Sequence, residues 1–154
     1  MITLFFDGLC MPKNPGGVAT YGYVIYSDGK KLKEGWGFVG AGMFGDDVTN
    51  NVAEYFAIIK GLESALSMGY PDAILIKGDS RLVIEQLSGR YAVRSPRLNE
   101  LHRRAKELLG MFKSVSLEWV PRGENSEADA LSRRAFNEFV RKHRVEYENF
   151  YSRR

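Results

Sequence analysis

The sequence is poor in residue types that usually mark a redox site or a membrane segment. Its 154 residues include a single cysteine, Cys10, which rules out an internal disulfide and suits a reducing cytoplasm. Because no histidine lies near it in the sequence, this thiol is more typical of a packing residue than of a nucleophile. No apolar run reaches membrane-spanning length, and no basic leader precedes the first apolar segment. We therefore expect one cytoplasmic domain with no membrane partner.

The charged residues are unevenly distributed along the chain. The net charge is +3, with acids frequent between residues 46 and 79 and arginines concentrated after Arg81. One interpretation is a solvated surface that aids solubility. The other is a polyanion partner, with the acids reserved for a metal site. Charge alone leaves both interpretations open.

Hydrophobic periodicity predicts an α/β fold. The order βββ-α-β-α-α-β-α implies a mixed sheet, with three antiparallel strands followed by parallel additions, flanked by helices. We assign residues 1–143 to this domain and residues 144–154 to a C-terminal tail that either packs or frays. The expected strands are residues 2–6, 20–26, 33–39, 73–77 and 114–120, and the expected helices are residues 51–68, 80–87, 95–112 and 126–143.

Four acidic residues stand where predicted strands end or predicted helices begin. Asp7 and Asp79 follow apolar strands, whereas Glu54 and Asp129 lie in the first turn of a helix. In a mixed sheet with the first strand at its centre, all four positions can share one rim. Rims of this kind are where α/β folds place their sites.

Each of these acids also has a purely structural explanation. Asp7 precedes a glycine and can be a turn residue. Asp79 can cap the helix that follows it. Glu54 and Asp129 each stand three residues after a polar residue at a predicted helix start, which is the spacing of a capping box. These explanations are weaker together than singly, because they leave the shared rim unexplained.

Four clustered carboxylates would repel one another unless a cation lay between them. A divalent metal removes that cost, and ligands that are all oxygen, without histidine or cysteine, favour Mg²⁺ or Mn²⁺ over zinc. Two such ions about 4 Å apart activate a water and stabilise the leaving oxygen in phosphoryl transfer. The sequence therefore predicts a magnesium site, with Mn²⁺ as the alternative ion.

The same acids lie in four short motifs that occur in one order along the chain. Together they resemble type 1 ribonuclease H, and the resemblance covers about residues 1 to 140. The motifs are Asp7-Gly8-Leu9-Cys10 with Asn14-Pro15-Gly16-Gly17 behind it, Thr49-Asn50-Asn51-Val52-Ala53-Glu54, Lys77-Gly78-Asp79-Ser80 and Asn125-Ser126-Glu127-Ala128-Asp129.

This resemblance implies a five-stranded mixed sheet and Mg²⁺-dependent cleavage of the RNA strand of RNA–DNA hybrids, leaving 5′-phosphate and 3′-hydroxyl ends. Asp7, Glu54, Asp79 and Asp129 match the family's catalytic metal ligands. With substrate bound, Asp7 would bridge two ions, Glu54 and Asp79 would complete one site, and Asp129 would complete the other. The residues expected to bind substrate are Gly8, Asn14, Thr49, Asn50, Asn51, Ser80 and Arg122.

The sequence departs from many relatives in two places. The loop at residues 121–124 has no histidine, and neither His102 nor His143 matches the histidine that those relatives carry there. Residues 89–95 form only a short linker, where many relatives have a basic helical protrusion. A short form of this kind, with Pro-Gly-Gly after the first strand and an extra C-terminal segment, resembles the archaeal-type members, some of which also cleave duplex RNA. Duplex RNA is therefore a second expected substrate.

Two other functions remain as alternatives. The first is a non-catalytic module that binds hybrids or duplex RNA. The complete acid set disfavours it, because a binder gains nothing from clustered carboxylates beside a polyanion. The second is another metal nuclease of the same superfamily, such as a 3′–5′ exonuclease or a strand-transfer enzyme. The Asn-Asn-x-Ala-Glu pattern at residues 50–54 favours ribonuclease H instead.

Overall fold

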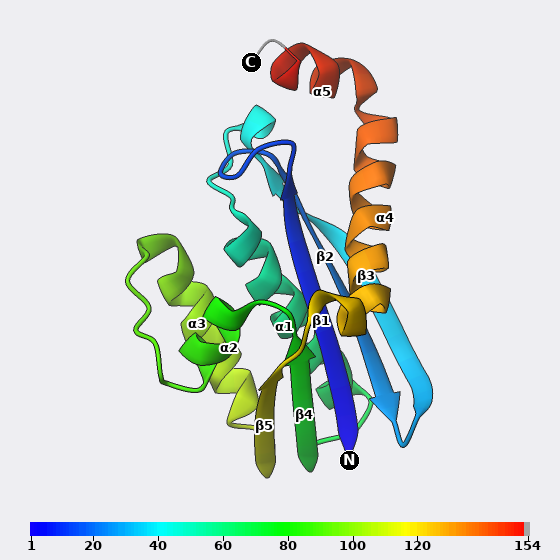
Figure 1. Ribbon diagram of the computed structural model, residues 1–154, viewed down its shortest axis with the longest axis vertical. Helices are drawn as coiled ribbons and strands as arrows, with labels where there is room; N and C mark the ends of the chain where they lie inside the picture. Colours follow the sequence, from blue (N-terminus) through cyan, green and yellow to red (C-terminus); the bar gives the residue numbers. More distant parts are fainter. Residues whose placement is uncertain (153–154) are drawn as a thin grey trace.

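The computed structural model describes residues 1–152 and contains a five-stranded sheet with helices on both faces (Figure 1). The first three strands are antiparallel neighbours, β4 runs parallel to β1, and β5 runs parallel to β4. This confirms the predicted mixed sheet. In the spatial order β3-β2-β1-β4-β5, the strands are β1 (Ile2–Met11), β2 (Val18–Ser27), β3 (Lys30–Ala41), β4 (Ala73–Gly78) and β5 (Ser114–Trp119).

Five α-helices and two short 3₁₀ turns complete the described part of the chain. Each predicted helix is present, with ends shifted by at most three residues. None of the helices within residues 1–152 is both long and apolar enough to cross a membrane. The helical segments are η1 (Gly42–Phe44), α1 (Asn50–Ser67), α2 (Arg81–Leu87), α3 (Pro96–Leu109), η2 (Arg122–Asn125), α4 (Ser126–Lys142) and α5 (Arg144–Tyr151).

The alternation of side chains along β1 divides the molecule into layers. Ile2, Leu4 and Phe6 are buried in the main core with α1 and α3, whereas Thr3 and Phe5 point to the other face and are only half-buried. Helix α4 lies on that second face, over β2 and β3 (Figure 1). Residues of β1 with odd numbers therefore face α4, which places Asp7 on the α4 side of the sheet.

The sequence predicted too short a first strand. It placed the end of the first strand at Phe6 and the start of the second strand at Thr20. In the structure β1 continues to Met11, because Cys10 and Met11 pair with Ala19 and Val18 of β2. The connecting loop is reduced to residues 12–17. The Asp-Gly pair at residues 7 and 8 lies inside a strand and is not a turn.

The C-terminal tail packs instead of fraying over the residues that the structure describes. It forms α5, whose aromatic side chains join a small cluster with Val18, Ala41 and Phe139. The Tyr151 hydroxyl donates to the carbonyl of Gly16 at 2.9 Å and accepts from the amide of Met43 at 3.3 Å. The tail thereby contacts the β1–β2 loop at the top of the sheet in Figure 1. Residues 153 and 154 lie outside the described part.

Candidate active site

Asp7 lies in the middle of β1 and beside the end of β4. β4 pairs with β1 as far as Phe6, whose partner Gly78 is the last residue of β4. Asp7 is therefore the first residue of β1 without a strand neighbour on that side, although it still pairs with Gly22 of β2. The rim expected at the end of β1 is instead formed by the end of β4.

Three carboxylates converge at this rim. One oxygen from each of Asp7, Glu54 and Asp79 lies within 4.8 Å of the others. Asp79 follows β4 directly, and Glu54 reaches the site because α1 approaches β1 closely at Gly8. A Cβ atom at Gly8 would lie 2.4 Å from the backbone of Ala53 and Glu54, so only glycine permits this approach.

Burial and mutual repulsion oppose the ionisation of two of these carboxyl groups. Burial, followed by the charge of Asp79, raises the pKa of Asp7 to about 8, while a hydrogen bond from Ser132 acts in the opposite direction. Burial also raises the pKa of Glu54, with further contributions from the charges of Asp7 and Asp79. A cation bound between these carboxyl groups would stabilise their ionised forms.

The donor set fits a divalent metal with oxygen ligands. Within residues 1–152, the Oε2 atom of Glu54 is buried without a hydrogen-bond partner. A cation bound by Asp7, Glu54 and Asp79 would satisfy this oxygen and offset the repulsion among the three charges.

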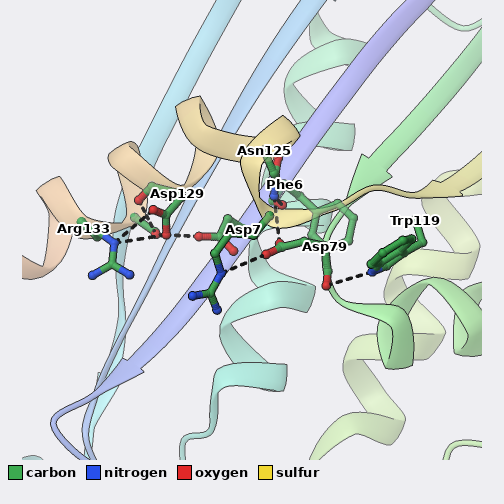
Figure 2. A network of polar contacts seen from close by, with 9 residues as sticks. Phe6, Asp7, Asp79, Trp119, Asn125, Asp129 and Arg133 are labelled. Carbon is green, nitrogen blue, oxygen red and sulfur yellow. Dashed lines mark hydrogen bonds and ion pairs between the residues drawn. The ribbon is translucent and has the colours of Figure 1, made fainter.

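Asp129 lines the same cleft beside Asp7, but it lies outside the group of three converging carboxylates. The cleft has a volume of about 370 Å³ and all four acids line it. The converging oxygens come from the other three acids, however, and the Asp129 carboxylate accepts from Arg133 Nε at 3.1 and 3.2 Å. Figure 2 shows this pair on one side of Asp7, with Asp79 on the other. The positive charge next to Asp129 is therefore the guanidinium group of Arg133.

Asp79 is held from two sides (Figure 2). The buried Asn125 uses its Nδ2 to donate to Asp79 Oδ1 at 3.0 Å and to the carbonyl of Phe6 at 2.8 Å. The indole of Trp119 donates to the Asp79 carbonyl at 3.2 Å, and Arg122 Nε lies 3.7 Å from Asp79 Oδ2. These contacts join the ends of β4 and β5 to the start of α4, so the position of Asp79 depends on three elements.

None of the acids caps a helix in the way that the structural explanations required. Thr49 is the N-cap of α1, and its hydroxyl accepts from the Val52 amide at 3.1 Å, so Glu54 is too far along to complete a capping box. Ser80, not Asp79, is the N-cap of α2. Helix α4 follows Asn125, which makes no side-chain capping bond. With Asp7 inside a strand, all four structural explanations are wrong.

The expected substrate-binding residues fall into two groups. Most of them line the cleft beside the acids, while Thr49 is buried as a helix cap and Asn51 lies outside the cleft lining. Asn14 and Asn50 hold each other, since Asn14 Nδ2 donates to Asn50 Oδ1 at 2.7 Å and the Asn50 amide donates to Asn14 Oδ1 at 3.1 Å. Their contacts with substrate stay predictions. The cleft-lining members are Gly8, Asn14, Asn50, Ser80 and Arg122.

Sequence reasoning missed the buried residues that support the acids. Ser132 donates to Asp7 Oδ2 at 3.0 Å, and Asn125 appeared only as part of a motif. The spacing of Ser132, three residues after Asp129, places both on neighbouring faces of α4 and could have suggested a shared site. The burial of both supporting residues arises from tertiary packing, which no local pattern in the sequence reports.

Comparison with known proteins agrees with this geometry. Residues 6–135 match a family model described as reverse transcriptase-like. Ribonuclease HI of Halobacterium salinarum is 39% identical over 134 residues, which cover 87% of this chain. The crystal structure of RNase H1 from the same archaeon superposes with a TM-score of 0.80 at 40% identity, covering 89% of this chain and 98% of that one. This chain belongs to the type 1 ribonuclease H family.

Two further ribonuclease H structures have the same fold. The N-terminal RNase H domain of Rv2228c from Mycobacterium tuberculosis has a TM-score of 0.81 at 35% identity and covers 92% of this chain and 96% of that one. LC11-RNase H1, solved in complex with an RNA/DNA hybrid, has a TM-score of 0.81 at 29% identity. The match covers 91% of this chain and 99% of that one. The chain spans only 24% of the full mycobacterial protein and 63% of the halobacterial ribonuclease HI.

The connection between α2 and α3 identifies the form of ribonuclease H. α2 ends at Leu87 and α3 begins at Pro96, with no helix between them. The basic helical protrusion of many relatives is therefore absent from this position, as the sequence predicted. Neither histidine lines the cleft: His102 lies within 3.2 Å of the Gln86 carbonyl, and His143 stacks on Phe139.

Proposed function

We propose that this chain is a metal-dependent endoribonuclease that cleaves the RNA strand of RNA–DNA hybrids, with 5′-phosphate and 3′-hydroxyl products. The observation that carries the proposal is the convergence of Asp7, Glu54 and Asp79 within 4.8 Å in an open cleft. The hybrid bound to the related LC11-RNase H1 supports this substrate. A non-catalytic binder would face the repulsion between these acids and a polyanion without any gain.

The four acids divide into two sets of ligands in this proposal. Asp7, Glu54 and Asp79 would hold one ion, and Asp7 with Asp129 would hold a second once substrate draws Arg133 away. Bound Mg²⁺ or Mn²⁺ would supply the positive charge that makes a water nucleophilic and stabilises the leaving oxygen. The chain itself orients the acids, because Asn125 fixes Asp79 and Ser132 fixes Asp7.

The cleft wall offers groups suited to a nucleic-acid backbone. Asn14 and Asn50 lie at the N-terminal end of α1, Ser80 caps α2, and Arg122 stands beside Asp79. Amides, hydroxyls and guanidinium groups at such positions bind phosphate and ribose oxygens. Hybrids and duplex RNA are distinguished from DNA by groove shape and the 2′-hydroxyl, so we propose duplex RNA as a second substrate.

A panel of matched RNA–DNA, RNA–RNA and DNA–DNA duplexes of one sequence tests the function directly. We expect cleavage of the RNA strand of the hybrid with Mg²⁺ or Mn²⁺, none with EDTA, and none of duplex DNA. Analysis of the product ends separates this reaction from an exonuclease, which would release mononucleotides from an end. Binding of the hybrid without cleavage at any metal concentration would contradict the proposal and favour the binding module.

Binding of the hybrid should be sensitive to salt. Arg122 and Arg133 line the cleft beside the acids, and each phosphate that they neutralise releases counterions. We expect the affinity of the inactive Asp7→Asn variant for a labelled hybrid to fall at least roughly 10-fold between about 50 and 200 mM NaCl. Fluorescence anisotropy measures this, and an affinity independent of salt would show that the arginines do not contact phosphates.

A further inference from the structure

We propose that Ser132 is a positioning residue that orients the Asp7 carboxylate for metal binding. Its side chain is fully buried on α4, and its hydroxyl lies 3.0 Å from Asp7 Oδ2. Within residues 1–152, no other side chain donates a hydrogen bond to Asp7. The inference rests on the proposed function only in taking Asp7 as a metal ligand.

The backbone of Ser132 is fixed in place by β2. Thr20 of β2 donates from its hydroxyl to the Ser132 carbonyl at 2.7 Å, and this bond is buried. Two residues further on, Gly22 lets α4 lie directly on the strand, since a Cβ there would be 2.7 Å from the Ser132 amide nitrogen. Gly22 is also the strand partner of Asp7. The hydroxyl is therefore held at a fixed place beside the carboxylate that it contacts.

The Ser132 hydroxyl has one proton and two acceptors within reach. Besides Asp7 Oδ2, the carbonyl of Asp129 lies 2.9 Å away, which is the local contact that a helical serine commonly makes. That carbonyl already has its intrahelical acceptor role, whereas the buried carboxylate has no other side-chain donor. Because hydrogen bonds to a charged acceptor are about twice as strong, the proton should go to Asp7 once this carboxylate is ionised to bind a metal.

The consequence is a carboxylate with two unlike oxygens. The hydrogen bond occupies Oδ2 and fixes the rotation of the group, so that Oδ1 remains for a cation shared with Glu54 and Asp79. Without this bond, Asp7 would have to be ordered by the metal itself, and part of the binding energy would be spent on ordering it. Ser132 should therefore affect metal affinity more than the rate at metal saturation.

Titration of Mn²⁺ without substrate, followed by isothermal calorimetry, tests this on the whole chain. We expect Ser132→Ala to weaken Mn²⁺ binding about 10-fold, the lower end of the range for lost supporting hydrogen bonds. In hybrid cleavage, the Mg²⁺ concentration for half-maximal rate should rise by a similar factor, while the rate at saturating Mg²⁺ should fall less than about threefold.

Ser67→Ala is the matched control, because it removes a helical serine hydroxyl that donates to the carbonyl three residues earlier, at the C-terminal end of α1, without touching Asp7. It should leave Mn²⁺ affinity unchanged. A Ser132→Ala affinity within twofold of wild type would overturn the inference, as would an equal loss in Ser67→Ala. If wild type binds Mn²⁺ but cleaves no duplex, the proposed function fails while the calorimetric comparison still decides the role of Ser132.

Discussion

Replacement of Asp7 by asparagine is expected to abolish cleavage of the hybrid while leaving its binding intact. Asp7 is the acid common to both proposed ion positions, and a metal ion contributes several kcal/mol of charge stabilisation to such a reaction. A loss of roughly 4 kcal/mol corresponds to a rate at least about 10³-fold lower. Single-turnover cleavage and anisotropy with the same labelled hybrid measure the two effects separately.

The control for this variant is Asp72→Asn, because Asp72 is exposed and its carboxylate pairs with Lys113 at 3.4 Å, away from the cleft. It should cleave at the wild-type rate. Turnover by Asp7→Asn within tenfold of wild type would show that the converging carboxylates are not the catalytic metal site.

The Asp7→Asn variant should also change how the free energy of unfolding depends on pH, measured in EDTA. Folding raises the pKa of Asp7 from 3.8 to about 8, chiefly by burial, so between these values the folded chain retains a proton that the unfolded chain has released. Wild-type stability should therefore fall as pH rises from about 4 to about 8. Asp7→Asn should show a shallower fall and a higher melting temperature at pH 8. Parallel curves for the two proteins would contradict the assigned pKa.

Substitution of Gly8 by alanine should have the largest effect on the fold. The added Cβ would lie 2.4 Å from the Ala53 carbonyl carbon and the Glu54 amide nitrogen. These are backbone atoms of α1 and cannot rotate away, so α1 must move off β1. We expect a loss of at least about 3 kcal/mol, the upper end for overpacking, and inactivity from the displaced carboxylate of Glu54. Urea denaturation and a cleavage assay measure the two losses.

Gly110→Ala provides the comparison, since its new Cβ would meet nothing nearer than 3.4 Å. Its free energy of unfolding should be within about 0.5 kcal/mol of the wild-type value. If Gly8→Ala behaves in the same way, the close packing of α1 on β1 does not hold Glu54 in the site. Gly8 would then retain only the substrate contact that its motif suggested.

The sequence predicted the order of helices and strands because each segment has a clear hydrophobic periodicity. It failed at the end of β1, where a local Asp-Gly pattern indicated a turn. Pairing of Cys10 with Ala19 and of Met11 with Val18, nine and seven positions away across the loop, extends the strand to Met11 instead. Predicted ends elsewhere differ by a few residues, since capping by Thr49 or Ser80 depends on single hydroxyl groups.

The four acids could be found in the sequence because motifs and element ends mark them. Their supporting residues could not, because Ser132 and Asn125 acquire their roles only when α4 lies against β1 and β2. The arginine that holds Asp129 was likewise only one of many basic residues in the second half of the chain. Burial and partner choice are properties of the assembled sheet, so no local pattern contains them.

The origin of the carboxylates in separate elements has a consequence for the newly made polypeptide. Asp7, Glu54 and Asp79 come from a central strand, a helix and the end of a second strand, and they meet only when all three have docked. In an unfolded or incompletely synthesised chain, these carboxylates are separated and solvent-exposed, so they bind a divalent ion only weakly. Ion capture is thus confined to the finished molecule, and each captured ion draws the folding equilibrium toward it.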